Sequence, residues 1–500
     1  MGATTQAGAP ITEALGLREF HPFSAAGEHF LYMVPSAGVF HVDEPSYEVL
    51  QALDGVGLTP NEITAALADR HQADVVEQAI VELITIRAIG AVAAPLKRAL
   101  PVLPTENFPL QTMVLNVTNK CNLACTYCYE YGEDKIVDTD FGAKPKFMDE
   151  ATARESVDFM FREAGSNPIS NLTFFGGETL LNFKVLKKTL AYARERGNIL
   201  GKKVRFSLTT NATLLRPEVI EWLVDNEVGV TISIDGPKES QDQFRVFKNG
   251  MGSYEVVLPK IKELLTRHKS RPIGARVTLT KQNLNVKKIY RHLTDEVGFW
   301  TVGFAPVTTA DGRDYAIEGD EYAAMLAQFD ELAEEFKEAA LENRHHGFSN
   351  LNETLQEIHK GMSKAFPCGA GLGLVGVATD GDVALCHRFA GSDEHKIGSV
   401  QDGIDREQQA RFLETHHIGH KTDCHTCWAR PLCAGGCYHE AHTRYGTTTQ
   451  PNLHYCDWIR SWTDTCLRIY GEIATHNPDF LRQYDHDAST AAPTTAPVPA

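Results

Sequence analysis

The 500-residue sequence has no long apolar run and a deficit of basic residues. No stretch of about eighteen apolar residues is present that could span a bilayer. Residues 1–16 do not form the basic and then apolar pattern of a secretory signal. Lys and Arg together number 48 against 65 Asp and Glu, a formal net charge of −17, and no basic stripe is present. We therefore expect a cytoplasmic protein that binds neither nucleic acid nor a membrane.

Cysteine is missing from most of the chain and concentrated in two regions. Three of the eleven cysteines lie within residues 121–128 and eight lie within 368–466. The count is odd, and long cysteine-free stretches separate the groups. In a reducing compartment this distribution indicates metal or cluster ligation rather than disulfides.

The length predicts two to four structural units. In residues 1–95, two short strand patterns flank the turn at residues 35–38, and three helical patterns follow, at Ser46–Leu53, Thr59–His71 and Val75–Ile89. This is the layout of a small winged-helix domain. The alternative is an N-terminal extension that packs on the rest of the protein.

Residues 108–310 alternate between strand and helix patterns. The six predicted strands are Met113–Val117, Leu172–Phe175, Val204–Thr209, Val228–Ile234, Arg276–Thr280 and Val302–Val307. The helical patterns between them include Glu150–Glu163, Phe183–Arg196, Pro217–Asp225 and Tyr254–Arg267. Such alternation predicts an α/β fold with a parallel sheet. Six units favour a partial (β/α)6 TIM-like barrel over a closed eight-stranded one.

The C-terminal part of the chain is divided by composition. Residues 311–365 read as a long amphipathic helical connector, and residues 366–475 are rich in cysteine and short elements. Residues 488–500 are mainly Ala, Thr and Pro, which predicts a disordered tail.

The first cysteine group directly follows the first predicted barrel strand. Cys121, Cys125 and Cys128 can bind three irons of a [4Fe–4S] cluster and leave the fourth iron open. A structural zinc site normally needs a fourth protein ligand, and none is close in sequence. The CxxxCxxC spacing, with Tyr127 before the third cysteine, resembles the radical S-adenosylmethionine (radical SAM) superfamily. The resemblance implies that the open iron binds S-adenosyl-L-methionine, whose one-electron cleavage yields methionine and a 5′-deoxyadenosyl radical.

The resemblance continues at the ends of the later predicted strands. It implies a cofactor-binding role for eight residues: Tyr127, Gly176, Gly177, Glu178, Asn211, Ser233, Arg245 and Arg276. The alternative for the Gly-Gly-Glu segment is a simple strand-to-helix turn, and for Arg276 an exposed strand arginine. Most of these residues lie at or just after the carboxyl ends of strands, where the chemistry of barrel enzymes gathers.

The second cysteine group resembles the SPASM domain of radical enzymes that modify peptides. The pattern is Cys368-x12-Gly381-x4-Cys386, then Cys424-x2-Cys427-x5-Cys433-x3-Cys437, then Cys456. The resemblance implies a distal auxiliary cluster on Cys424, Cys427, Cys433 and Cys456. It also implies a proximal cluster with an open iron on Cys368, Cys386 and Cys437, and therefore three [4Fe–4S] clusters in all. Structural zinc at Cys424–Cys437 is the alternative, and Cys466 is expected to be a buried apolar residue.

Three features resemble thioether-forming peptide maturases, namely the N-terminal module, residues 116–131 and Cys386-His387-Arg388. The most similar group acts on the small subunit of quinohemoprotein amine dehydrogenase. This implies cross-links from Cys sulfur to side-chain methylene carbons of Asp or Glu in a cysteine-rich substrate polypeptide. It also implies a leader captured by the N-terminal module as an added strand, and an electron donor such as flavodoxin or ferredoxin.

Other readings remain open from the sequence. Sulfatase-maturating relatives have Asp where this chain has His387, which counts against formylglycine formation. Asp235 is a candidate base at the mouth of the fourth strand, with ribose binding or turn formation as alternatives. Two further functions are a maturase that forms thioethers at the α-carbon of another peptide (the sactipeptide type) and a non-catalytic iron–sulfur scaffold.

Overall fold

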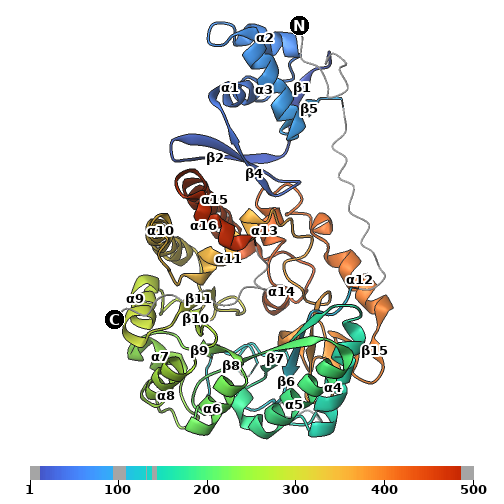
Figure 1. The fold of residues 1–500 in the computed structure, drawn as a ribbon, viewed down its shortest axis with the longest axis vertical. Helices are drawn as coiled ribbons and strands as arrows, with labels where there is room; N and C mark the ends of the chain where they lie inside the picture. Colours follow the sequence, from blue (N-terminus) through green and yellow to red (C-terminus); the bar gives the residue numbers. More distant parts are fainter. Residues whose placement is uncertain (1–11, 94–107, 131, 138–143, 486–500) are drawn as a thin grey trace.

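The computed structural model describes residues 12–93, 108–130, 132–137 and 144–485, and its centre is a single large sheet (Figure 1). The strand order is β11-β10-β9-β8-β7-β6-β12-β13-β14-β15. The six barrel strands are β6 (Thr112–Asn116), β7 (Ile169–Phe175), β8 (Lys203–Thr210), β9 (Gly229–Ser233), β10 (Gly274–Leu279) and β11 (Thr301–Pro306). Every neighbouring pair among them is parallel. The predicted α/β fold with a partial barrel is confirmed.

Helices connect these strands along the outer side of the barrel. They are α4 (Glu150–Glu163), α5 (Phe183–Leu200), α6 (Pro217–Asp225), α7 (Lys238–Phe244), α8 (Tyr254–Arg267) and α9 (Val286–Arg291). The sequence predicted α4, α6 and α8 with the observed bounds, because clear start signals mark two of them. Asp149 caps α4 by accepting a hydrogen bond from the Thr152 amide, and α6 begins with a proline in its first turn.

The cysteine-rich region extends the barrel sheet, which the sequence did not predict. β12 (Leu374–Val377) pairs in parallel with β6, and β13 (Asp382–Ala384), β14 (Lys396–Ser399) and β15 (Gly403–Ile404) follow as antiparallel strands. These strands have only two to four residues, too few to show a period. Backbone hydrogen bonds therefore join the region after residue 366 to the first barrel strand.

The N-terminal module contains more strand than expected. β2 (Phe20–Ala25), β3 (Glu28–Met33) and β4 (Gly38–Val42) form an antiparallel sheet, and β1 (Leu15–Leu17) pairs with β5 (Ile89–Ala91). The predicted hairpin corresponds to β3 and β4, whereas β2, β1 and β5 were missed. The helices are α1 (Glu44–Ala52), α2 (Pro60–Ala66) and α3 (Ala73–Thr85). A capping box between Thr59 and Glu62 starts α2, which ends earlier than predicted.

The sheet of this module has two buried faces. Leu31 and Met33 belong to the module's own core, together with residues of the three helices. Phe30 and Tyr32, the alternate residues of β3, belong to the main core of the molecule. In Figure 1 the module (blue) accordingly lies next to α15 (Cys456–His476, red).

The connector and the C-terminal region are mainly helical. The single long helix predicted for the connector is two helices, α10 (Asp320–Leu341) and α11 (Ser349–His359), separated by residues 342–348. Beyond them lie α12 (Arg406–His416), α13 (Arg430–Cys433), α14 (Tyr438–Tyr445), α15 and α16 (Pro478–Leu481). None of the helices in the described ranges is both long and apolar enough to cross a bilayer. The predicted tail 488–500 lies outside the described residues.

Candidate active site

A cavity of about 440 Å³ lies at the carboxyl ends of the barrel strands. Cys121, Cys125 and Cys128 line it from the loop after β6. Seven of the eight residues predicted to bind the cofactor line it too: Tyr127, Gly176, Gly177, Asn211, Ser233, Arg245 and Arg276. Parallel strands bring these residues together because all their carboxyl ends meet at one edge of the sheet.

The three thiols suit an iron–sulfur cluster. None of them forms a disulfide in the part of the chain that the structure describes. Burial raises the pKa of Cys121 to about 12, and the neighbouring Cys125 and Cys128 act in the same direction. Thiols this close repel one another as thiolates, and bound iron removes both that repulsion and the cost of burying the charge.

Gly176 lets the chain after β7 pass close to the chain after β6. Its φ is +121°, and a Cβ there would lie 2.4 Å from the Thr118 carbonyl oxygen. An L-residue is therefore excluded by both backbone strain and contact. The close approach exposes the backbone of Gly176 and Gly177 to the cavity.

Glu178 does not line the cavity, in contrast to its predicted contact with the cofactor. Its side chain is fully buried, and its carboxylate accepts hydrogen bonds from the Leu180 amide (3.0 Å), the Thr210 hydroxyl (2.7 Å) and the Asn211 amide (2.8 Å). Burial nevertheless raises its pKa, although these three hydrogen bonds act in the opposite direction. Glu178 therefore fixes the ends of β7 and β8 relative to each other.

Asp235 is also buried and fully engaged, which argues against its predicted role as a base. Its carboxylate lies 2.9 Å from Nε of Arg245 and accepts hydrogen bonds from the Tyr127 hydroxyl and the Thr278 amide (3.0 Å). Asp235 is 1% exposed and does not line the cavity, whereas Tyr127 and Arg245 do. It therefore positions two cavity residues and does not itself reach the cavity.

His387 and Arg388 of the Cys-His-Arg segment also line the cavity. Burial and the adjacent Arg388 guanidinium lower the pKa of His387 to about 3, so its imidazole is neutral near pH 7. Nη1 of Arg388 donates a hydrogen bond to the Thr308 hydroxyl (3.0 Å), and the guanidinium lies 4.5 Å from the centre of the Tyr129 ring. Sequence reasoning noted these residues only as a family feature; their adjacency to Cys386 was the available signal for a place in the site.

Seven of the eight remaining cysteines lie in two groups, which contain the residues of the two predicted ligand sets. Cys424, Cys427, Cys433 and Cys456 line one small cavity. Cys386 has a pKa raised to about 12 by burial and by the nearby Cys437 and Cys368. Cys466 is fully buried in the main core, as expected.

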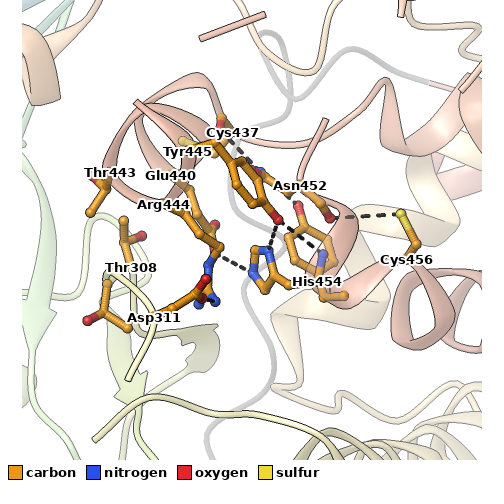
Figure 2. Close-up of polar contacts among 12 residues, drawn as sticks. Thr308, Asp311, Cys437, Glu440, Thr443, Arg444, Tyr445, Asn452, His454 and Cys456 are labelled. Carbon is orange, nitrogen blue, oxygen red and sulfur yellow. Dashed lines mark hydrogen bonds and ion pairs between the residues drawn. The ribbon is translucent and has the colours of Figure 1, made fainter. Parts of the chain in front are cut away.

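Asn452 connects the two groups (Figure 2). Its side-chain amide donates a hydrogen bond to the Cys437 carbonyl oxygen (3.2 Å), and its own carbonyl oxygen lies 3.8 Å from Sγ of Cys456. Beside it, Nε2 of His454 lies 3.0 Å from the Glu440 carboxylate. The network holds α14 against the start of α15, so one cysteine of each group has a fixed place relative to the other.

A second cavity of about 340 Å³ adjoins the first. The two share Arg276, Ala305 and Pro306 as lining residues. The lining of the second cavity includes three carboxyl groups, Glu353 and Glu357 of α11 and Glu440 of α14, together with Lys364 and Cys433. It also includes the aromatic rings of Phe329, Tyr455, Trp458 and Trp462. A space of this size beside the first accommodates a peptide side chain and its neighbours.

Comparison with known proteins finds a match to the barrel. Residues 115–292 match the model of the radical SAM superfamily. The match begins within β6 and includes the three-cysteine loop and β7 to β10.

Similar proteins cover from one third to three quarters of the chain. An uncharacterized protein of Methanocaldococcus jannaschii is 32% identical over 176 residues, which are 35% of this chain and 55% of that protein. The cysteine-type anaerobic sulfatase-maturating enzyme of Clostridium novyi is 24% identical over 367 residues, 71% of this chain and 94% of that enzyme. The solved structure of native anSMEcpe with bound AdoMet superposes with a TM-score of 0.60 at 22% identity, covering 76% of this chain and 100% of that one. About three quarters of this chain therefore shares its fold with that structure.

Proposed function

We propose that the protein is a radical SAM peptide maturase that forms thioether bonds from Cys to Asp or Glu in the small subunit of quinohemoprotein amine dehydrogenase. The observation that carries the proposal is the pair of adjoining cavities. One is lined by the three-cysteine loop and the other by carboxyl groups and aromatic rings, with two further cysteine groups nearby. The first suits a cluster with its cofactor, and the second suits a peptide.

Ten cysteines would hold the iron. We assign a [4Fe–4S] cluster to Cys121, Cys125 and Cys128, a distal cluster to the cysteines at 424, 427, 433 and 456, and a proximal one to those at 368, 386 and 437. The first cluster and S-adenosylmethionine supply, when bound, a radical that removes a hydrogen atom from an unactivated carbon. The glycines at 176 and 177, with Asn211, Ser233, Arg245 and Arg276, would bind the cofactor.

Residues of the chain itself position the lining of the first cavity. Asp235 holds Arg245 next to Tyr127 of the three-cysteine loop, and the neutral imidazole of His387 brings no charge to the cavity. Thioether formation also needs an acceptor for the thiol proton. Glu353 is our candidate, because it faces the second cavity and burial raises its pKa, which makes it a stronger base.

We propose that the N-terminal module binds the leader of the substrate. The β2-β3-β4 sheet is antiparallel, and β4 pairs only with β3 among the described strands. Its other edge therefore has backbone groups available for an added strand, a common way of binding a peptide. The module touches α15, which begins with a ligand of the proposed distal cluster.

Coexpression with the small subunit and mass analysis of that subunit test the proposal. Each bridge should remove two hydrogens, and tandem spectra should place it between a Cys sulfur and an Asp or Glu side chain. The Cys121→Ala variant is the control and should leave the peptide unmodified. A bridge at a backbone α-carbon would show that the enzyme is of the sactipeptide type. An unbridged subunit, together with formation of formylglycine when a sulfatase peptide is supplied, would show a sulfatase-maturating enzyme.

A further inference from the structure

Lys421 is a buried cation in the cysteine-rich region. Its residue is 3% exposed, although lysine is almost never fully buried without a partner. It precedes the Cys424–Cys427 loop, and the Cys424 amide donates a hydrogen bond to its carbonyl oxygen (3.1 Å). Lys421 therefore belongs to the turn that leads into the first distal cysteine.

The ammonium group of Lys421 lies beside the segment that joins the two cysteine groups. A Cβ on Gly435 would be only 2.7 Å from Nζ of Lys421, and Gly435 has a φ of +86°. Gly435 stands between Cys433 of the distal group and Cys437 of the proximal group. The nearest ring is that of Tyr438, whose centre is 5.3 Å from Nζ.

The charge of Lys421 has no carboxylate partner among the described residues. The groups that act on it electrostatically are four cysteines, Cys424 and Cys433 from one group and Cys368 and Cys437 from the other. A buried ammonium without a counter-ion is strongly unfavourable, and a single aromatic ring offsets only part of that cost. Burial lowers the pKa of the ammonium group, and the four cysteines act in the opposite direction. A negatively charged cluster on either cysteine group would therefore supply the missing counter-charge.

We propose that Lys421 is the shared counter-ion of the two auxiliary clusters and raises the reduction potential of both. This inference rests on the ligation proposed above. A reduced cluster carries one more negative charge than the oxidised one, so a fixed cation beside it favours reduction. Because Nζ lies beside Gly435, between a cysteine of each group, its charge acts on the reduction potentials of both clusters. Higher potentials favour transfer of the electron that is released when the thioether bond forms from the substrate to the auxiliary clusters.

A redox titration of the full-length, iron-loaded protein, followed by electron paramagnetic resonance, tests this role. Lys421→Met should shift the potentials of both auxiliary clusters to more negative values, with iron content unchanged. Lys421→Arg keeps the charge and should restore them. The control is Lys396→Met, which removes an exposed lysine of the same region that is paired with Asp382 (2.6 Å) and should leave both potentials in place.

The outcomes separate the inference from the ligation on which it rests. Iron content of the unaltered protein tests ligation, whereas the variants test the lysine. Unshifted potentials in Lys421→Met, or a shift confined to one cluster, would overturn the shared role. If Lys421→Met loses iron, the redox titration is done on Lys421→Gln instead. Loss of iron in all three variants, including Lys421→Arg, would show that the lysine has a structural role and would also overturn the inference.

Discussion

Individual buried charged residues position the side chains that line the first cavity. Asp235 connects Tyr127, Arg245 and the backbone of β10, so Asp235→Asn should damage the cavity rather than remove a base. Leaving Arg245 buried without its carboxylate should cost about 3 kcal/mol of folding stability. We expect cleavage of S-adenosylmethionine without peptide to fall in this variant, measured as 5′-deoxyadenosine formed with dithionite. Unchanged cleavage with only thioether formation lost would restore Asp235 as the base.

At the residue scale, the sequence indicated the candidate cluster ligands but not the roles of the buried carboxylates that position the cavity residues. The cysteine groups could be assigned because their spacing is itself the signal, and the structure brings the predicted members of each group together. Glu178 and Asp235 follow strands as cofactor residues do, but their side chains turn into the protein. Whether a carboxylate faces a cavity or a backbone amide depends on atoms far away in sequence, such as the Thr278 amide, and no local pattern encodes that.

At the scale of elements, α15 provides the surface on which the N-terminal module rests. The Ala26 amide donates a hydrogen bond to Glu472 (2.7 Å), and His21 lies 2.8 Å from Asp464. Gly471 allows the approach, since a Cβ there would be 2.7 Å from Cβ of Ala25. Residue size at this one helical position therefore controls the contact.

Gly471→Val should push β2 away from α15. Overpacking of this kind typically costs about 1–3 kcal/mol, and the module is the part able to move. We expect weaker binding of a labelled leader, measured by fluorescence anisotropy, with peptide-independent 5′-deoxyadenosine formation retained. Thr475→Val, at an exposed position of the same helix, is the matched control. Equal leader affinity in Gly471→Val and the control would favour the alternative, in which the module is an extension that only packs on the rest of the protein.

Elements with a clear period and clear ends could be predicted from the sequence. The parallel strands β7 and β8 and the helices α4, α6 and α8 have both. β12 to β15 have neither, because two to four residues show no period and pairing with β6 is a contact across more than 250 residues. The connector was read as one helix because residues on both sides of 342–348 are helical in pattern.

At the scale of the whole molecule, the domains are less separate than the sequence implied. One sheet runs from the barrel into the cysteine-rich region, and one face of the module's β-sheet belongs to the main core. Deleting residues 1–95 would therefore remove Phe23 and Phe30 from that core, in addition to removing the proposed leader-binding sheet. A substitution at the contact is a cleaner test than a truncation.

The iron inventory of the whole molecule gives the last prediction. Three [4Fe–4S] clusters correspond to about twelve irons per chain. Replacing Cys121, Cys125 and Cys128 together with Ala should lower this to about eight, because the other two cysteine groups lie outside the first cavity's three-cysteine loop. The variant should form no 5′-deoxyadenosine with dithionite while its auxiliary clusters still give resonance signals. Continued 5′-deoxyadenosine formation would mean that the reactive cluster lies elsewhere. An unaltered protein with zinc in place of iron at Cys424–Cys437 would instead remove the distal cluster and, with it, the route proposed for the departing electron.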